Sequence, residues 1–141
     1  MTGSVDETYV AALQHDLVEP GDAALVGVVR RPTGWFRAET DENQPALGPP
    51  EALLDETKDR TEELKRRGMC DEGAHNAAWE ETDFTRRYRE YLDADPAARD
   101  ALSDLAGRVA AGEDVWLVCF EGEGKRCHRH PLAERLRERV A

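Results

Sequence analysis

Residues 115–132, VWLVCFEGEGKRCHRHPL, decide the fold. The first six, Val115 to Phe120, form the most strand-like run in the chain, and Pro131 is well placed to open a helix. Between them lies a loop that contains Gly122 and Gly124. The stretch therefore predicts a buried strand, a loop and a helix N-terminus. Such loops collect ligands because they lie at the carboxyl ends of parallel strands, beside free backbone amides.

The rest of the chain predicts a second strand and further helices. Residues 23–29, AALVGVV, read as a buried strand that ends at Arg30 and Arg31, and residues 9–13 as a weaker strand before it. Helices are expected over about 51–67, 77–92 and 95–111, with irregular segments at about 32–50 and 69–76. We therefore expect one α/β domain over 1–141, with a small, mainly parallel sheet flanked by helices.

The charge of the chain is strongly acidic. Thirty Asp and Glu residues oppose nineteen Lys and Arg residues, a formal net charge of −11, and only three of the basic residues are lysines. An acidic, lysine-poor surface suits a salt-rich cytoplasm and suggests a halophilic host such as an archaeon; an ordinary acidic cytosolic protein is the alternative. The net charge disfavours general nucleic-acid binding, although a local basic site is still allowed.

The cysteine count and the lack of long apolar runs indicate where the protein works. Cys70, Cys119 and Cys127 are an odd number of cysteines in a chain whose first residues do not resemble a secretory signal. We therefore expect reduced thiols in a cytoplasm. No run of about 18 apolar residues exists, so no membrane span or membrane partner is expected.

Basic residues cluster in the loop of the opening stretch. Five of the six residues 125–130 are Lys, Arg or His. Arg30 follows the other strand, and parallel strands would bring it to the same edge of the sheet. We therefore expect Arg30, Arg126 and Arg129 to hold a small phosphate- or sulfate-like anion, with Glu121 orienting the arginines.

The same loop contains two thiols. A thiolate beside arginines and a helix N-terminus is activated for nucleophilic attack. Cys127 is the predicted nucleophile and His128 its acid–base partner, whereas Cys119 lies in an apolar run and is interpreted first as packing. Cysteine phosphatases and rhodanese-type sulfurtransferases share this strand–loop–helix logic. Because six residues separate Cys119 from Arg126, one more than in the phosphatase pattern, the likeness is one of architecture.

Three other interpretations remain open. A metal site at Cys119, Cys127, His128 and His130 is disfavoured, since the usual ligand spacings are absent and neighbouring cations would repel the ion; no metal or cofactor is predicted. The cluster of Cys127, His128 and Arg129 could instead be structural, with Arg129 paired to Glu121. The turn could also serve a non-catalytic module that binds nucleic acid or a protein partner.

Three segments of the chain resemble the Domain of Unknown Function 488 family. The signature is Leu117 to Glu121, a short loop, Cys127-His128-Arg129 and then Leu132-Ala133. Phe84, Tyr88 and Leu92, followed by the helix that contains Leu102 and Leu105, resemble the helical segment that precedes this signature. Residues 26–32 resemble the early strand of the family, although Val28 stands where an aspartate is expected. The resemblance covers about residues 9–140. It implies a small α/β domain without a settled activity, and it carries over Arg30, Cys119, Glu121, Cys127, His128 and Arg129 as site residues.

Overall fold

A four-stranded parallel sheet lies at the centre of the computed structural model, which describes residues 1–141. The strands are β1 (Val5–Tyr9), β2 (Ala24–Gly27), β3 (Glu42–Asn43) and β4 (Val115–Cys119), in the order β1-β4-β2-β3. All pairings are parallel, so the carboxyl ends of the strands meet at one edge of the sheet. The predicted α/β class is confirmed.

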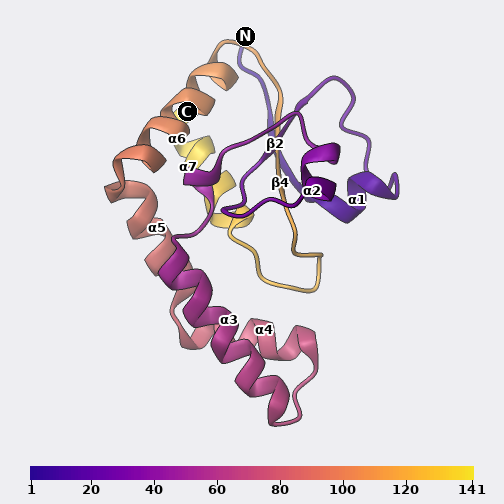
Figure 1. Cartoon of the computed structure of the whole chain (residues 1–141). Coiled ribbons are helices and arrows are strands. Elements are labelled where there is room, and N and C mark those ends of the chain that lie inside the picture. The colour runs from indigo at the N-terminus through magenta and orange to yellow at the C-terminus, as the bar shows by residue number, and fades with distance from the viewer.

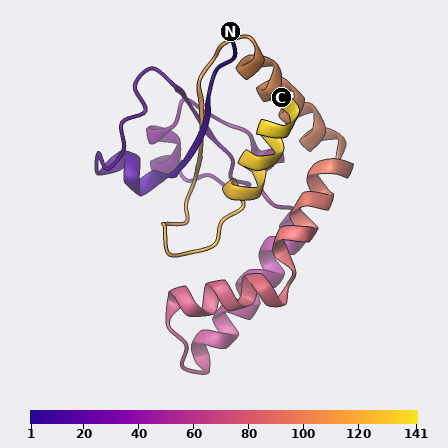
Figure 2. The same ribbon diagram turned by 180° about the vertical axis from the view of Figure 1, so that it is seen from behind.

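Helices surround the sheet and extend beyond it. They are α1 (Val10–Gln14), α2 (Gly34–Glu39), the 3-10 helix η1 (Pro45–Leu47), α3 (Glu51–Arg66), α4 (Asp71–Glu81), α5 (Phe84–Ala94), α6 (Pro96–Ala110) and α7 (Arg129–Val140). Figure 1 shows α6 and α7 on one side of the sheet, and α1 and α2 on the other. Helices α3 and α4 form a hairpin, here called the arm, beyond the carboxyl edge of the strands. Figure 2, which shows the molecule from the opposite side, shows the β4–α7 loop extending toward this arm.

Local signals set several helix ends where the sequence predicts them. Asp95 caps α6, because its carboxylate accepts the Ala98 amide at 3.0 Å, and Pro96 occupies the first turn. Gly68 follows the end of α3 with a φ of 103°, a left-handed conformation that favours glycine.

Two predictions about the helices are wrong. The single helix over 77–92 is two helices, because Asp83 adopts a left-handed φ of 54° between α4 and α5. The segment 69–76 is not irregular, since α4 begins at Asp71. Its cap is the Cys70 sulfur, which accepts the Gly73 amide at 3.3 Å. The sequence does not predict this helix start, because Cys70 is not a common N-cap residue and Gly73 in the first turn disfavours a helix.

The remaining differences concern short elements. The strand predicted at residues 9–13 lies earlier, at β1, and residues 10–14 are helical. The segment 32–50 contains α2, β3 and η1. β1 is an edge strand whose Asp6 and Glu7 hide the apolar pattern of a buried strand. None of the helices combines the length and apolar character that a membrane crossing needs.

Packing divides the molecule into two unequal parts. The main core of 24 buried residues joins the sheet to α5, α6 and α7 and includes Tyr88, Leu117 and Leu132. A separate cluster of three buried residues, Leu64, Ala74 and Ala78, holds α3 against α4 in the arm. The carboxyl edge of the sheet, where β4 ends, faces the arm.

Candidate functional site

Cys119 lies at the carboxyl end of the central strand. It is fully buried, and in the sheet register it stands beside Tyr9 of β1. The chain leaves the sheet at Phe120, whose ring lies 4.7 Å from that of Phe36 between centroids. The sheet edge therefore holds Cys119 in a fixed, buried position.

Cys127 returns to the same place just before α7. It is 1% exposed, and its Sγ is in contact with the Sγ of Cys119, a pairing of the disulfide type. The two Cα atoms are 7.7 Å apart, wider than the roughly 4.4–6.8 Å that most disulfides span. The backbone spacing suits two adjacent thiols, and a relaxed disulfide would bring the two Cα atoms closer. The fold thus brings together the two sulfurs that the sequence left separate.

His128 is buried and has a fixed orientation. Its Nε2 lies 2.5 Å from the carbonyl oxygen of Val28, just beyond β2, and its Nδ1 lies 3.7 Å from the Cys127 sulfur. A carbonyl can only accept, so Nε2 carries the proton and Nδ1 is left as an acceptor for the thiol. Burial lowers the pKa of His128 to about 4, so the ring is neutral at pH 7.

Arg129 is a buried cation on the other side of the thiol pair. Its NH1 donates to the Cys119 sulfur at 2.8 Å and to the carbonyl oxygen of Glu121 at 2.5 Å. Its Nε lies 3.5 Å from Glu7 of β1, and its guanidinium lies 5.7 Å from the Tyr9 ring centroid. Burial lowers the pKa of Arg129 while Glu7 raises it; an arginine remains charged at neutral pH. This charge favours the thiolate form of Cys119.

A cavity of about 450 Å³ opens between the carboxyl edge of the sheet and the arm. Cys119, Cys127 and His128 form part of its wall on the sheet side. The other side chains that line it are Val29, Arg30, Arg31, Pro49, Leu54, Asp55, Thr57, Lys58, Thr61, Glu62, His75, Trp79, Phe84, Phe120 and Glu121. Both thiols therefore reach a cavity large enough for a small molecule.

Arg30 lines this cavity and is held by neutral groups. Its Nε donates to the Pro49 carbonyl at 3.1 Å, and its NH2 donates to the Gly48 carbonyl at 3.0 Å and to the Tyr91 hydroxyl at 2.7 Å. No carboxylate pairs with it, and its NH1 has no hydrogen-bond partner. Arg31, in contrast, is paired with Glu51 and Asp55. Arg30 therefore brings an uncompensated positive charge to the cavity.

The other predicted cationic residues lie elsewhere. Arg126 is exposed and paired with Glu80 of α4, and Lys125 is paired with Asp71. Both line a second cavity of about 420 Å³ on the outer side of the loop, which Cys127 also borders. Arg30, Arg126 and Arg129 thus occupy three different environments. The Glu121 carboxylate lines the first cavity, 3.8 Å from the Lys125 Nζ, and only the backbone carbonyl of Glu121 meets Arg129.

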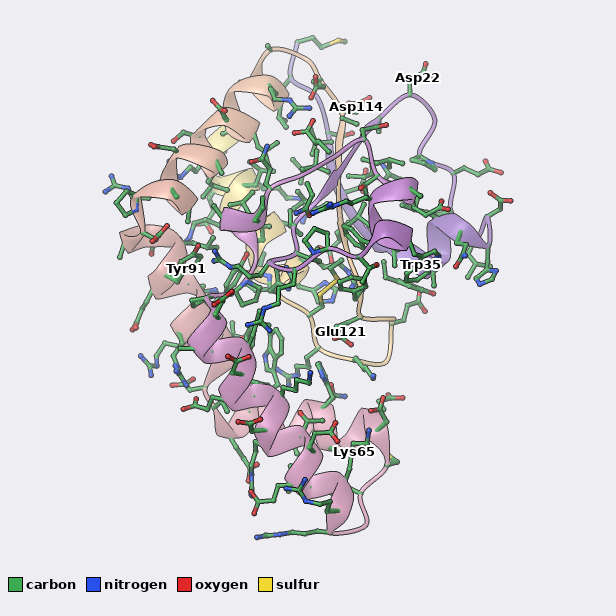
Figure 3. All side chains as sticks on the ribbon, viewed as in Figure 1. Asp22, Trp35, Lys65, Tyr91, Asp114 and Glu121 are labelled. Carbon is green, nitrogen blue, oxygen red and sulfur yellow. A yellow bond between two sulfur atoms is a disulfide. The ribbon has the colours of Figure 1, made fainter.

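Helix α4 supplies contacts that the sequence did not predict. The Asn76 side chain donates to the Gly124 carbonyl at 2.9 Å and accepts the Arg126 amide at 2.8 Å. His75 Nε2 lies 2.7 Å from the Arg126 carbonyl oxygen. Figure 3 places Glu121 in this loop, between the sheet and the arm. Asn76 and Glu7 are site residues that the sequence does not reveal, because each of their contacts joins segments far apart in the chain.

No three His, Cys, Asp or Glu side chains are arranged so that they could hold a metal ion. The chemistry that this arrangement offers comes from its own groups: two adjacent sulfurs, a neutral imidazole acceptor, a buried guanidinium and a second cation facing the cavity. Together they can support nucleophilic or redox chemistry of a thiol.

Comparison with known protein families identifies the family of the chain. The family model described as the active DUF488-N3 subclade, DUF488-N3a, matches residues 8–140 and so nearly the whole chain. No curated protein and no solved structure matches the chain. The matched span agrees with the resemblance over about residues 9–140. The chain belongs to the Domain of Unknown Function 488 family.

Proposed function

We propose that the protein is a thiol-dependent enzyme that binds a small anionic ligand in the 450 Å³ cavity. One observation carries the proposal: Cys127, its acceptor His128 and the uncompensated cation Arg30 all line the same cavity. The nucleophile, the base and the anion-binding charge could therefore all contact one ligand bound in this cavity.

Two cations are available to the anion. Arg30 has an unused NH1 and no carboxylate partner, and Lys58 on α3 lines the same cavity without an ion pair. Asp55, Glu62 and Glu121 line the cavity too. Because these carboxylates repel negative charge, they confine an anionic group to the neighbourhood of Arg30 and Lys58.

The rest of the lining favours a ligand that also has an apolar part. Leu54, Trp79, Phe84 and Phe120 contribute apolar surface to the cavity. Burying such surface against a ligand is favourable in proportion to its area, and aromatic rings add specific stacking geometry. We therefore expect a small organic anion, with its charged group at Arg30 and its apolar part against the aromatic side chains.

The reaction would use Cys127 as the nucleophile. Nδ1 of His128 is free to accept the thiol proton because Nε2 donates to Val28. Since the pKa of His128 is lowered to about 4, the ring holds this proton only during the transfer and passes it on. The sulfur then attacks an electrophilic atom of the bound anion and displaces a leaving group, which takes the proton from His128, while Arg30 offsets the negative charge. Arg129 acts through Cys119 and the loop, since it does not line the cavity.

The alternative, a non-catalytic module for nucleic acid or a protein partner, has less support. In the turn, Arg126 is exposed and Lys125 is partly exposed, and each is paired with a carboxylate of α4. A phosphate-binding face needs unpaired cations. The description of the matched family as an active subclade also favours an enzyme.

Competing alkylating reagents test the proposal in the reduced protein. Iodoacetate is anionic and iodoacetamide is neutral, and exposed Cys70 is an internal reference thiol. We expect the rate ratio of iodoacetate to iodoacetamide to be roughly tenfold or more higher at Cys127 than at Cys70, because the unpaired charges of Arg30 and Lys58 attract the carboxylate of iodoacetate. Inorganic sulfate should slow the iodoacetate reaction at Cys127 alone.

Lysine substitutions test whether the charges of the cavity cause the higher rate ratio at Cys127. Lys58→Gln should lower the rate ratio at Cys127 and leave the ratio at Cys70 unchanged. The matched change Lys65→Gln, on α3 but outside the cavity lining, should leave the ratio at Cys127 unchanged. A Cys127 that does not react, or that shows the same ratio as Cys70, would overturn the proposal.

The acidic surface supports a further part of the proposal, that the protein works in a salt-rich cytoplasm. At a net charge of −11 the folded chain repels itself, and salt screens that repulsion. The free energy of unfolding should therefore rise with potassium chloride concentration. A fall over the molar range would count against a halophilic host.

A further inference from the structure

The two sulfurs of the site have different surroundings. Cys119 accepts an N–H from the buried Arg129 at 2.8 Å, whereas Cys127 faces the neutral ring of His128 at 3.7 Å. Their Sγ atoms are in contact, and both cysteines line the main cavity. One sulfur is thus held next to a positive charge while the other has a proton acceptor.

We propose that Cys119 is the resolving thiol of Cys127, so that the site cycles between a dithiol and an internal disulfide, with small-molecule disulfides as the electron acceptor. The inference rests on the proposed function only in taking Cys127 as the attacking thiol. It assigns to Cys119 a chemical role in place of the packing role that its apolar strand predicts.

Oxidation proceeds in two displacement steps. Cys127 gives its proton to His128, and its sulfur attacks a disulfide R–S–S–R, forming a mixed disulfide and releasing one thiolate. The thiolate of Cys119 then attacks the Cys127 sulfur, closes the internal disulfide and releases the second thiolate. Two electrons pass from the cysteines to the small disulfide. The two thiol protons end on the two released thiols, and no other oxidant is required.

The positions of the partners fit these roles. The second step needs Cys119 as a thiolate, and the N–H donated by Arg129 stabilises that form. In the reverse direction an incoming thiol attacks Cys127 and expels Cys119. A thiolate stabilised by a guanidinium is the better leaving group, so reduction is also directed to Cys127.

The spacing of the backbone is compatible with a reversible couple. A Cα separation of 7.7 Å places the sulfurs in contact while both residues keep the positions set by β4 and by the start of α7. Closing a relaxed disulfide moves the two Cα atoms toward each other. Since Cys119 ends the central strand, the loop is the part that moves. The Asn76 contacts with Gly124 and Arg126 adjust with it.

Oxidised glutathione is the probe that tests the couple. The background is Cys70→Ser, which removes the exposed third thiol and keeps a good helix cap. After reduction and treatment, this chain should lose the mass of two hydrogens and carry no glutathione. Trypsin cuts after Lys125 and Arg126, between the two cysteines, so the disulfide should appear as a cross-linked peptide pair that reductant separates.

Two variants in this background separate the roles of the cysteines. Cys119→Ser should trap one glutathione on Cys127, whereas Cys127→Ser should form such an adduct on Cys119 at least tenfold more slowly. If Cys119→Ser does not fold, Cys119→Ala and the parent chain still decide the matter. A parent chain that keeps two free thiols or accumulates the glutathione adduct would overturn the inference. Anion-directed alkylation of Cys127 can succeed or fail independently, so the two proposals remain distinguishable.

Discussion

The two walls of the cavity are built in opposite ways. On the sheet side, Cys119, Cys127 and His128 are 0%, 1% and 8% exposed and belong to or adjoin the main core. On the arm side, Asp55, Lys58 and Glu62 are exposed, and the separate hydrophobic cluster between α3 and α4 has three buried residues. The reactive groups thus lie on the densely packed part of the molecule, whereas the arm presents side chains that solvent also reaches.

The β4–α7 loop connects these two parts and shows the same contrast within four residues. Arg126 points outward and pairs with Glu80 of the arm, with about half of its side chain exposed. Arg129 points inward, and its side chain is 4% exposed. Two arginines of the same basic run therefore have different structural roles. Arg126 attaches the loop to the arm, and Arg129, the first residue of α7, contacts the Cys119 sulfur on the buried side.

Removing the charge of each arginine should give the largest difference between the two parts. Arg129→Met leaves the partly buried Glu7 without its guanidinium partner, with only His130 beside it, and should lower the free energy of unfolding by about 3 kcal/mol. Arg126→Met breaks an exposed pair and should cost about 0–1 kcal/mol. Urea unfolding of the reduced proteins measures both.

A second substitution tests the cause of this difference. Glu7→Gln added to Arg129→Met should recover part of the loss, because it removes the carboxylate left without its partner. Equal effects of the two arginine variants would show that the buried pair does not set the stability of the turn.

The buried imidazole gives the next largest effect, on the dependence of stability on pH. The pKa of His128 falls from an ordinary 6.5 to about 4 on burial. Between these values the unfolded chain binds a proton that the folded chain excludes, so stability falls as the pH decreases through this window. The loss should reach about 3 kcal/mol near pH 4, at roughly 1.4 kcal/mol for each pKa unit.

Urea unfolding from pH 7 to pH 4.5 measures this loss, with His128→Gln as the control. Glutamine can still donate to Val28 but does not titrate, so its curve should be flatter over the same range. Burial is the main cause, and Val28, Arg129 and His130 contribute smaller effects. Parallel curves for the two proteins would contradict the assignment to His128.

The sheet side of the cavity could be predicted from the sequence, and the reason is local. Apolar runs give β2 and β4, and parallel pairing then brings Arg30 to the same sheet edge as Cys119. The short loop and Pro131 return the chain to that edge, which places Cys127 and His128 there as well. Each step depends on neighbouring residues or on a general rule of sheet geometry.

The arm and the partner of Arg129 could not be predicted, because they depend on distant contacts. The start of α4 rests on a cysteine cap, and its end on a left-handed Asp83, neither of which is a strong signal. Glu7 meets Arg129 only because β1 pairs with β4. The direction of Arg126 likewise depends on where α4 lies. A charge run in a sequence does not reveal which of its cations are already paired.

Breaking the contact between the arm and the loop should have the smallest effect on the free energy of unfolding, and its effect on hydrogen exchange should be confined to one amide. Asn76→Ala removes a donor to Gly124 and an acceptor from Arg126, both near the surface, and should cost about 1 kcal/mol. Asn76→Asp keeps the acceptor and loses only the donor. Hydrogen exchange at the Arg126 amide should therefore accelerate in Asn76→Ala and stay slow in Asn76→Asp. If both variants exchange alike, the arm does not hold the loop through this side chain, and the ion pairs of Lys125 and Arg126 must supply the attachment instead.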